Sequence, residues 1–296
     1  MKIAVLGPKG TFSDKAYLEY EKYYKQQSAD AVPLEPVYFP TIDDVFRAVD
    51  EDEVSANTCD IGIVPIENTL DGYVMRTLDL ILEKNVCILD ENLVEVQFSL
   101  VGNVKSKDDI NKLYVQFKAH GQCRQFIDSL NEVSICTTES NMESYYRIEN
   151  NPGEAAVVPK HIADTETKRF VIDHVTDADN NYTRFVIFKR GKCDSTEVNS
   201  AKQRMNYKGD AERVRIPVYI MPKIDRPGIL FEILRDFYEN KINLISIISR
   251  PTKQGIGTYN FYIEIDGLYE SIDIILKTLD KIRVDNDIKV LGIYGE

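Results

Sequence analysis

The sequence predicts an α/β protein in which two small lobes are followed by a separate C-terminal βαββαβ domain. Up to about residue 190, short apolar runs alternate with helical patterns, which is typical of βαβ units in a parallel or mixed sheet. The chain has 296 residues, which is long for one core, since domains usually hold roughly 100 to 200 residues. We expect two lobes with a cleft between them in residues 1–190, a linker in 191–211 and the C-terminal domain in 212–296.

The elements of the two lobes are predicted from short local patterns. Apolar or β-branched runs indicate buried strands, and apolar residues at every third or fourth position indicate helices. The expected strands are Ile3–Leu6, Ile61–Ile66, Leu113–Phe117, Ala155–Val158 and Phe185–Phe188, with a segment rich in β-formers over Val86–Leu100. The expected helices are Ile42–Val49, Leu78–Glu83 and Gly121–Leu130.

The C-terminal domain is predicted from a cleaner pattern. The segment Gly191–Asp210 before it is dominated by polar residues without apolar periodicity, which indicates a linker. The expected strands are Val214–Met221, Ile242–Ile248, Gly257–Ile265 and Ile288–Ile293, and the expected helices are Gly228–Tyr238 and Ile272–Leu279. This order of elements is the ferredoxin-like split motif.

Charge and composition exclude several classes of function. The net charge of −12 and the lack of a basic stripe argue against nucleic-acid binding, which requires cations to neutralise phosphates. No apolar stretch approaches the roughly 18 residues that span a bilayer, and Met1-Lys2 leads directly into a strand instead of a signal peptide. We therefore expect a soluble, cytoplasmic protein without a membrane partner.

The cysteines and histidines do not form a metal or disulfide pattern. The five cysteines are widely spaced without a Cys-x-x-Cys pair, and the three histidines are isolated. A metal-free site without a cofactor is therefore expected. The residues concerned are Cys59, Cys87, Cys123, Cys136, Cys193, His120, His161 and His174.

Three polar clusters stand beside apolar runs in the N-terminal part. Asn181–Phe185 begins one strand-like run, Gly7–Ser13 follows the strand Ile3–Leu6, and Glu67–Thr69 ends the strand Ile61–Ile66. Glycines let the backbone approach a ligand, and a helix N-terminus attracts an anion. Because polar groups at strand ends are typical of pockets in open α/β sheets, the clusters indicate a site for an anionic substrate.

Each cluster also fits a purely structural interpretation. Ser13 suits a helix N-cap, Glu67-Asn68 suits a turn, and Thr183-Arg184 suits an ordinary strand with one exposed face. In the C-terminal domain, Arg226-Pro227-Gly228 opens a helix and Ser249-Arg250-Pro251 ends a strand. These two segments fit either a site for a small carboxylate or a tight turn and a strand end.

In these motifs the chain resembles the prephenate dehydratases of the phenylalanine pathway that carry a C-terminal ACT domain. The resemblance runs from Lys2 to nearly Glu296. The motifs that carry it are Gly7–Ser13, Val64–Thr69 continuing through Gly72 to Thr77-Leu78-Asp79, Asn181–Phe185, and Pro227-Gly228 with Ser249-Arg250-Pro251.

The resemblance implies a fold, a reaction and a regulator. The two lobes are expected to be like those of periplasmic binding proteins, with prephenate in the cleft between them. A lyase of this family converts prephenate to phenylpyruvate by losing carbon dioxide and the ring hydroxyl together, and it needs no cofactor. The ACT domain is expected to bind phenylalanine at a subunit interface and inhibit the enzyme, which favours a homodimer or homotetramer.

The resemblance also implies roles for individual residues. Thr183 is expected to donate a hydrogen bond or proton to the leaving hydroxyl, and Arg184 to hold a carboxylate in a forked contact. The other catalytic candidates are Glu67, Asn68 and Gln122, and the other substrate-binding candidates are Thr11, Gly10, Ser13, Asn181 and Phe185. The expected effector site comprises Pro227, Gly228, Ile229, Leu230, Ser249, Arg250 and Pro251.

Two segments depart from the family pattern. Val115, Gln116, Phe117 and Lys118 stand where the family commonly has Ser-His-Pro-Gln, so one pocket hydroxyl is lost and the rate or substrate range is in question. Ile248 replaces the glutamate that usually precedes Ser249-Arg250-Pro251, which puts phenylalanine control in question. Two alternative functions therefore stay open, a non-aromatising prephenate decarboxylase and a non-catalytic metabolite sensor.

Overall fold

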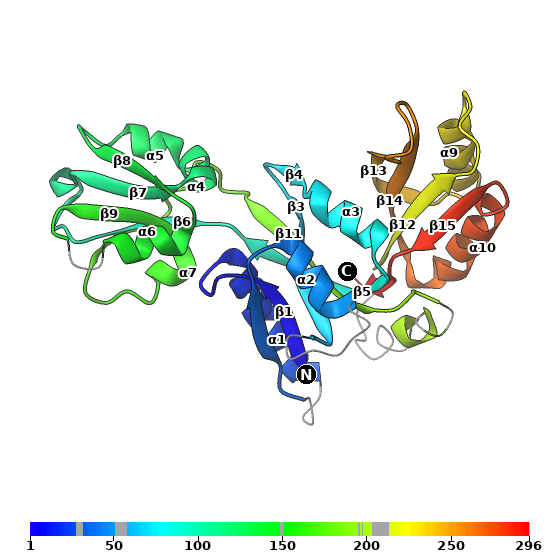
Figure 1. Cartoon of the computed structure of the whole chain (residues 1–296), viewed down its shortest axis with the longest axis horizontal. Coiled ribbons are helices and arrows are strands. Elements are labelled where there is room, and N and C mark those ends of the chain that lie inside the picture. The colour runs from blue at the N-terminus through cyan, green and yellow to red at the C-terminus, as the bar shows by residue number, and fades with distance from the viewer. Residues whose placement is uncertain are drawn as a thin grey trace.

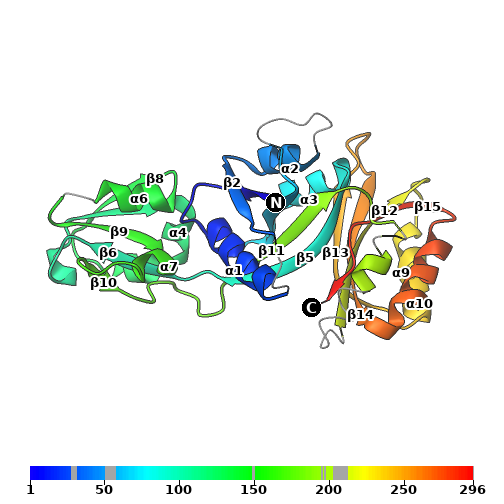
Figure 2. The same ribbon diagram turned by 90° about the horizontal axis from the view of Figure 1, so that it is seen from below.

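The protein consists of three units in a row, each built around its own β-sheet (Figure 1). The computed structural model describes residues 1–27, 32–50, 58–148, 151–194, 196, 198–202 and 213–295. Lobe 1 lies in the middle, lobe 2 at one end and the C-terminal domain at the other, and Figure 2 shows the same order from a second direction. The expectation of a two-lobed α/β part followed by a βαββαβ domain is confirmed.

Lobe 1 contains both the beginning and the end of the N-terminal part of the chain. Its sheet has the strand order β2-β1-β3-β11-β5, with β4 beside β3. β1, β2 and β3 run parallel, while β11 is antiparallel to both β3 and β5. The elements are β1 Lys2–Leu6, α1 Phe12–Gln27, β2 Glu35–Phe39, α2 Ile42–Asp50, β3 Ile61–Asn68, β4 Gly72–Tyr73, α3 Met75–Glu83, β5 Val86–Glu95 and β11 Tyr182–Arg190.

Lobe 2 is formed by the chain between β5 and β11. Its sheet has the order β10-β6-β9-β7-β8. The strands are β6 Phe98–Gly102, β7 Lys112–Gln116, β8 Ser134–Thr138, β9 Glu154–Pro159 and β10 Phe170–Ile172. The helices are η1 Lys107–Asp109, α4 Phe117–Gln122, α5 Arg124–Asp128, α6 Asn141–Arg147 and α7 Lys160–Ala163.

Two features at the start of lobe 2 depend on more than local sequence patterns. The β-rich segment Val86–Leu100 is divided between the sheets of the two lobes, because β5 ends at Glu95 and β6 begins at Phe98. The single helix expected over Gly121–Leu130 is wrong. Two short helices meet at Cys123, whose backbone leaves the helical region at φ −123° and ψ 25°.

The C-terminal domain has the strand order of the ferredoxin-like motif. Its sheet runs β13-β14-β12-β15, with β16 beside β12. The elements are β12 Arg213–Pro222, α9 Ile229–Glu239, β13 Asn243–Pro251, β14 Tyr259–Leu268, η2 Tyr269–Ser271, α10 Ile272–Ile282, β15 Asn286–Val290 and β16 Tyr294–Gly295. The cluster of buried side chains between the sheet and the helices holds Ile216, Ile233, Phe237, Ile263 and Leu279.

The expected linker contains structure. Residues 198–202 are helical, and Ala201 is buried in the core of the C-terminal domain. Residues 203–210 of the same segment lie outside the described residues. Only Val198 and Ala201 of this helix pack on that core, so its apolar stripe is too short to be recognised in the sequence.

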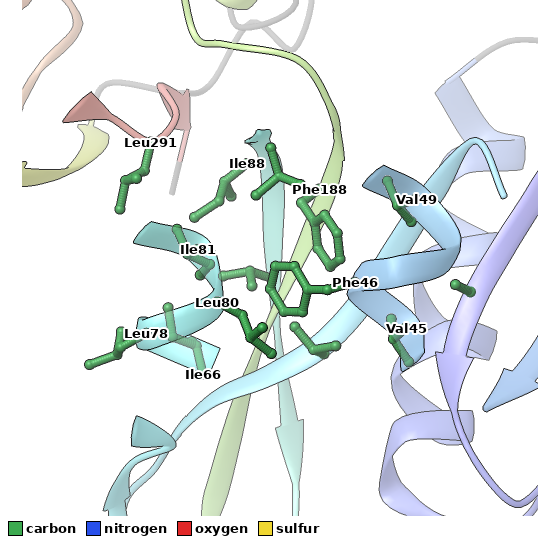
Figure 3. Close-up of a cluster of buried hydrophobic side chains, with 14 of the residues drawn as sticks. Val45, Phe46, Val49, Ile66, Leu78, Leu80, Ile81, Ile88, Phe188 and Leu291 are labelled. Carbon is green, nitrogen blue, oxygen red and sulfur yellow. The ribbon is translucent and has the colours of Figure 1, made fainter. Parts of the chain in front are cut away.

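Lobe 1 and the C-terminal domain share one hydrophobic core. Phe46 of α2 stacks on Phe188 of β11 with ring centroids 4.4 Å apart, and Leu291 approaches the same cluster from the C-terminal segment (Figure 3). Tyr219 and Tyr262, from β12 and β14, belong to this cluster as well. A shared core makes relative movement of the two units costly, because each buried aromatic side chain contributes roughly 2–3 kcal/mol.

Helix α3 forms the polar part of this contact. Tyr219 donates a hydrogen bond to the carbonyl of Leu78 at 3.0 Å. The Lys289 ammonium donates to the carbonyls of Ile81 and Lys84, both at 2.5 Å, and thus satisfies acceptors at the C-terminal end of α3. The sheet of the C-terminal domain is therefore anchored on the helix that follows the Glu67–Thr69 segment.

Candidate functional site at the junction of the two lobes

A chain of hydrogen-bonded polar side chains crosses from lobe 1 to lobe 2. The Asn68 amide donates to the Thr183 hydroxyl oxygen at 3.0 Å and to Asn181 Oδ1 at 2.9 Å. The Asn181 amide in turn donates to Gln122 Oε1 at 3.1 Å. Asn68 and Thr183 belong to lobe 1, Gln122 ends α4 of lobe 2, and Asn181 lies on the segment that connects the lobes. Four of the expected site residues are therefore brought together.

The sheet register explains why Asn68 and Thr183 meet. β3 and β11 are antiparallel, and Thr183 lies directly opposite Asn68. Directly opposed residues of an antiparallel pair have Cβ atoms about 4.5–5.5 Å apart, which suits a side-chain hydrogen bond. The last residue of one strand thus holds the hydroxyl near the beginning of the other.

Asn181 organises the network from a buried position. Its side chain is fully buried, and its carbonyl accepts a hydrogen bond from Val96 of the other connecting segment at 2.8 Å. The expectation that Asn181 binds substrate does not fit this position, because both ends of its amide are already bonded to protein groups. It holds Asn68 and Gln122 in place instead.

The Thr183 hydroxyl has a defined orientation. Its oxygen accepts from Asn68, and within the described residues its own proton has no protein acceptor within hydrogen-bonding distance. The side chain is only partly buried, so a ligand can reach it. A hydroxyl fixed through its oxygen is left to donate its proton to that ligand.

The N-terminal turn lies at the same edge of the lobe 1 sheet. β1 and β3 run parallel, so the turn after Leu6 and the residues after Asn68 leave the sheet on one side. The turn touches lobe 2, since the Gly10 carbonyl lies 3.1 Å from His161 Nε2 and the Phe12 ring contacts that of Phe98. The two strand ends are therefore in contact, and the turn leaves the same edge of the sheet.

Gly10 has no room for a side chain. Its φ is +89°, and a Cβ at this position would lie 2.6 Å from the sulfur of Met142 in α6. Its amide donates to Asp14 at 2.8 Å, and Asp14 also accepts a hydrogen bond from Tyr38. The glycine is therefore needed for the close approach of the two lobes.

The start of α1 differs from the N-cap interpretation of Ser13. The helix begins at Phe12, and the hydroxyl of Thr11 accepts a hydrogen bond from the Asp14 amide at 3.4 Å. Thr11 therefore occupies the capping position, and Ser13 is a buried residue of the first turn. Amides of this turn remain available to an anion near the lobe junction.

The expectation that Arg184 binds a substrate carboxylate is wrong. Successive side chains of a strand point to opposite faces, so Arg184 lies on the other side of β11 from Thr183. Its guanidinium is buried and hydrogen-bonded to Glu67 at 2.9 Å, to Glu91 at 3.1 Å and to Glu264 at 2.7 and 2.9 Å. Glu67, the proposed catalytic partner, points into the same cluster.

Phe185 is also unavailable to a substrate. Its ring is buried in the lobe 1 core with Ile3, Val5 and Ile63. This role follows from its place in the apolar run of β11, where it packs against β1 and β3. The expectation that it binds substrate is therefore wrong.

The segment that departs from the family pattern lies at the lobe junction. Val115 is buried in the lobe 2 core, and the Gln116 side chain caps α4 by accepting from the amides of Lys118 and Ala119. The Lys118 ammonium lies 3.8 Å from Asp71 of lobe 1. Val115 thus puts a core side chain where the family has a hydroxyl, Gln116 caps α4, and Lys118 adds an exposed cation that reaches the opposite lobe.

Sequence reasoning missed His161. Its ring lies in contact with Phe12 across the junction, and Nδ1 is buried without a hydrogen-bond partner within the described residues. The Gly10 carbonyl is an acceptor, so Nε2 carries the proton of the neutral ring. Burial, assisted by Lys15, lowers the pKa of His161, against the opposing effect of the Gly10 carbonyl, Asp14 and Asp164.

We expect this histidine to make the fold less stable in acid. Because its pKa in the fold is lower than the ordinary value near 6.5, its contribution is fully present above that value and is lost as pH falls through the lowered pKa. In His161→Gln, which keeps a donor but does not titrate, the melting temperature should fall less between pH 7 and pH 5 than in the parent. Parallel curves for the two proteins would show that His161 does not contribute.

The expected effector residues lie at one end of the C-terminal sheet. β12 and β13 both pair antiparallel with β14, so they run parallel, and Ile220 and Ser249 both face Phe261. The loop after β12 leads to Gly228, which precedes α9 with φ +87°, followed by Ile229 and Leu230 in its first turn. Pro227, Gly228, Ile229 and Leu230 thus lie at the same end as Ser249, Arg250 and Pro251.

Arg250 also reaches lobe 1. Its guanidinium forms an ion pair with Asp79 of α3 at 2.8 Å. The motif residues Thr77-Leu78-Asp79 are therefore part of the contact between the units, with the Thr77 hydroxyl bonded to the Pro65 carbonyl at 2.7 Å.

No described helix is long and apolar enough to cross a bilayer, and no group of three or more described acidic, His or Cys side chains is placed to hold a metal ion.

Comparison with known proteins agrees with this architecture. A family model described as prephenate dehydratase matches residues 3–193, and one described as ACT domain matches residues 223–282. The prephenate dehydratase of Methanocaldococcus jannaschii is 31% identical over 294 residues, which cover 97% of this chain and 95% of that protein. The crystal structure of the prephenate dehydratase of Staphylococcus aureus is similar with a TM-score of 0.77 at 27% identity, and it covers 100% of both chains. A prephenate dehydratase of Arthrobacter aurescens, solved in complex with L-Phe, gives 0.76 at 26% identity and covers 100% of this chain and 90% of that one.

Proposed function

The chain belongs to the prephenate dehydratase family and is a lyase of that family, and we propose that Thr183 and Asn68, at the junction of its two lobes, carry the conversion of prephenate to phenylpyruvate. The observation that carries this proposal is the orientation of the Thr183 hydroxyl. Asn68 donates to its oxygen at 3.0 Å, and its proton is free of protein acceptors within the described residues. The Thr183 hydroxyl can therefore donate a hydrogen bond to the ring hydroxyl that leaves prephenate.

The reaction requires little covalent chemistry from the protein. The bond between the ring and its carboxylate breaks to release carbon dioxide, and the electron pair moves through the ring. In the same step this pair expels the ring hydroxyl and makes the ring aromatic, and the departing oxygen takes up a proton, supplied from solvent by way of Thr183, to leave as water. Thr183 hydrogen-bonds this oxygen as charge develops on it, and hydrogen bonding of this kind with positioning contributes typically 10²–10⁴-fold.

The remaining groups hold the dianion. We propose that the backbone amides of Thr11 to Ser13, at the start of α1, bind the carboxylates of prephenate. Gly10, which has no side chain, lets the backbone come close to them. Gln122 faces the same junction from lobe 2 and fixes the far end of the hydrogen-bonded chain. Arg184 takes no part in binding, since its guanidinium is occupied by three carboxylates.

The C-terminal domain suits a regulatory role. We assign a phenylalanine site to the end of the sheet that holds Gly228 and Ser249, where α9 begins. The outer edge of β13 has no neighbouring strand among the described residues, and Ile245 and Ile247 on it are partly exposed, as is Phe231 on α9. An open edge beside apolar side chains favours pairing with a second copy, so we propose a homodimer or homotetramer, acting in the cytoplasm.

An end-point assay tests the proposed function. The purified chain is incubated with prephenate at neutral pH, base is added, and the absorbance of the phenylpyruvate enolate is compared with a reaction without protein. We expect phenylpyruvate to accumulate, and phenylalanine at millimolar concentration to slow its formation. Release of carbon dioxide without phenylpyruvate would identify a non-aromatising decarboxylase, and neither product would identify a binding protein.

A further inference from the structure

A buried ion cluster joins the catalytic lobe to the C-terminal domain. It comprises Arg184, Glu67 and Glu91 from lobe 1 and Arg215 and Glu264 from the C-terminal domain, and we call it the inter-domain ion cluster. Glu264 places both carboxylate oxygens on Arg184 Nη2, at 2.7 and 2.9 Å. Arg215 reaches back to Glu91 at 2.7 Å. Each unit thus contributes one guanidinium group that pairs with a carboxylate of the other unit.

Four of the five side chains of the cluster are shielded from water, and the fifth, Glu67, is 35% exposed. The side chains of Glu264, Arg184 and Glu91 are 1%, 7% and 13% exposed. Shielded charges interact through a lower effective dielectric constant and are screened little by salt. Breaking the contact between Arg184 and Glu264 would leave a buried charge unpaired, so the two groups move together.

The cluster is one residue away from the proposed reaction site on both strands. Thr183 lies opposite Asn68, and the next pair along the ladder is Arg184 opposite Glu67. Because side chains alternate along a strand, the first pair faces the site and the second pair faces the C-terminal domain. A displacement of Arg184 is therefore passed to Thr183 through a single peptide unit.

The pairing of β3 with β11 is irregular just beyond this point. The register of β11 against β3 shifts between Arg184 and Phe185. The extra residue is Ile66 of β3, while β11 stays in register with β5 from Tyr182 to Ile187, and such irregularities are a common means of redirecting a side chain, here that of Glu67. A cavity of about 240 Å³, lined by Arg184, Glu67, Tyr73, Ser246 and Glu264 among others, adjoins the cluster.

We propose that Arg184 is a positioning residue for Thr183, and that its ion pair with Glu264 is the link through which the C-terminal domain sets the position of that hydroxyl. Binding of the regulatory amino acid to the C-terminal domain then shifts β14, and Glu264 carries Arg184 and the start of β11 with it. The kinetic part of this inference rests on the proposed function, but the structural link itself does not.

The substitution Glu264→Gln tests the link with little change of shape. The cluster holds three carboxylates and two guanidinium groups, so removal of one negative charge leaves two of each sign. The glutamine oxygen still accepts hydrogen bonds from Arg184 and Tyr262. Glu83→Gln is the matched control, since it removes another ion pair between the units, that of Glu83 with Lys253 at 2.7 Å, on the exposed surface of α3.

Hydrogen–deuterium exchange of the peptide covering residues 181–185 decides the structural part without any ligand. We expect faster exchange in Glu264→Gln than in the parent and parental exchange in Glu83→Gln. Parental exchange in Glu264→Gln, or equal acceleration in both variants, would overturn the inference. Glu264→Asp, which restores the charge on a shorter side chain, should fall between Glu264→Gln and the parent, and it serves as the test if the glutamine variant does not fold.

Kinetics with prephenate decide the coupling. For Glu264→Gln we expect kcat to fall about fivefold or more with KM within about twofold, and the phenylalanine concentration for half inhibition to rise at least about fivefold, since coupling between sites is typically 5–150-fold. Glu83→Gln should match the parent in kcat, in KM and in the phenylalanine concentration for half inhibition. Unchanged phenylalanine inhibition in Glu264→Gln would refute the link. Failure of the proposed function is recognised separately, because the parent would then form no phenylpyruvate while the exchange result still stands.

Discussion

Replacement of Thr183 by valine is expected to lower kcat for phenylpyruvate formation by about 10²–10⁴-fold, with KM changed far less. Valine has nearly the shape of threonine but has no hydroxyl, so the leaving oxygen loses its donor. The fold should be retained, because Asn68 keeps the Asn181 side chain and the Tyr182 carbonyl as acceptors at 2.9 and 3.0 Å. Initial rates over a range of prephenate concentrations, together with a melting curve, measure both effects.

Thr183→Ser is the matched control for this prediction. Serine keeps the hydroxyl and lacks only a methyl group, so its turnover should stay within about tenfold of the parent, since only positioning is loosened. Parental turnover in the valine variant would remove Thr183 from the reaction. A valine variant with a much lower melting temperature than the serine variant would instead indicate a structural role for the hydroxyl.

The C-terminal domain could be predicted from the sequence element by element because its signals are local. The strand β12 is a run of apolar residues, and the helices repeat apolar residues at helical spacing, so β12, α9 and α10 agree with the expectations to within a few residues. The last expected strand, Ile288–Ile293, differs, because β15 spans Asn286–Val290 and a separate β16 spans Tyr294–Gly295. The helix at residues 198–202 is too short to show such a repeat, and it is fixed by the packing of Val198 and Ala201 on a core built from distant parts of the chain. Local periodicity contains no information about that contact.

The candidate site was only partly predictable, for a physical reason that differs between residues. The pairing of Asn68 with Thr183 and the contact of Gly10 with His161 depend on strand register and lobe packing, which the sequence does not display. The opposite orientations of Thr183 and Arg184, in contrast, follow from the alternation of side chains along any strand. Applied to the Asn181–Phe185 segment, that rule alone separates the hydroxyl from the guanidinium.

Replacement of Arg184 by methionine is expected to destabilise the fold by about 3–5 kcal/mol, because removal of one partner leaves buried charges uncompensated. Among the described cations, Arg215 alone would still pair with one of the three carboxylates of the inter-domain ion cluster, that of Glu91. Methionine fills much of the volume of the arginine side chain, so the loss of stability reflects the missing charge more than a cavity. Urea unfolding of the parent and the variant at neutral pH measures the difference in free energy of unfolding.

The pH dependence of this loss identifies its cause. Burial already raises the pKa of Glu91 above its ordinary value, against the opposing effects of Arg184 and Arg215, and loss of Arg184 raises it further. A carboxyl whose pKa is higher in the folded than in the unfolded state stabilises the fold as it becomes protonated. The loss of free energy of unfolding in Arg184→Met should therefore become smaller as pH falls toward the raised pKa of Glu91. Arg76→Met is the control, because it removes an exposed ion pair with Asp43 and should cost at most about 1 kcal/mol. A deficit in Arg184→Met as small as in this control, or one that does not change with pH, would show that the inter-domain ion cluster does not hold the two units together.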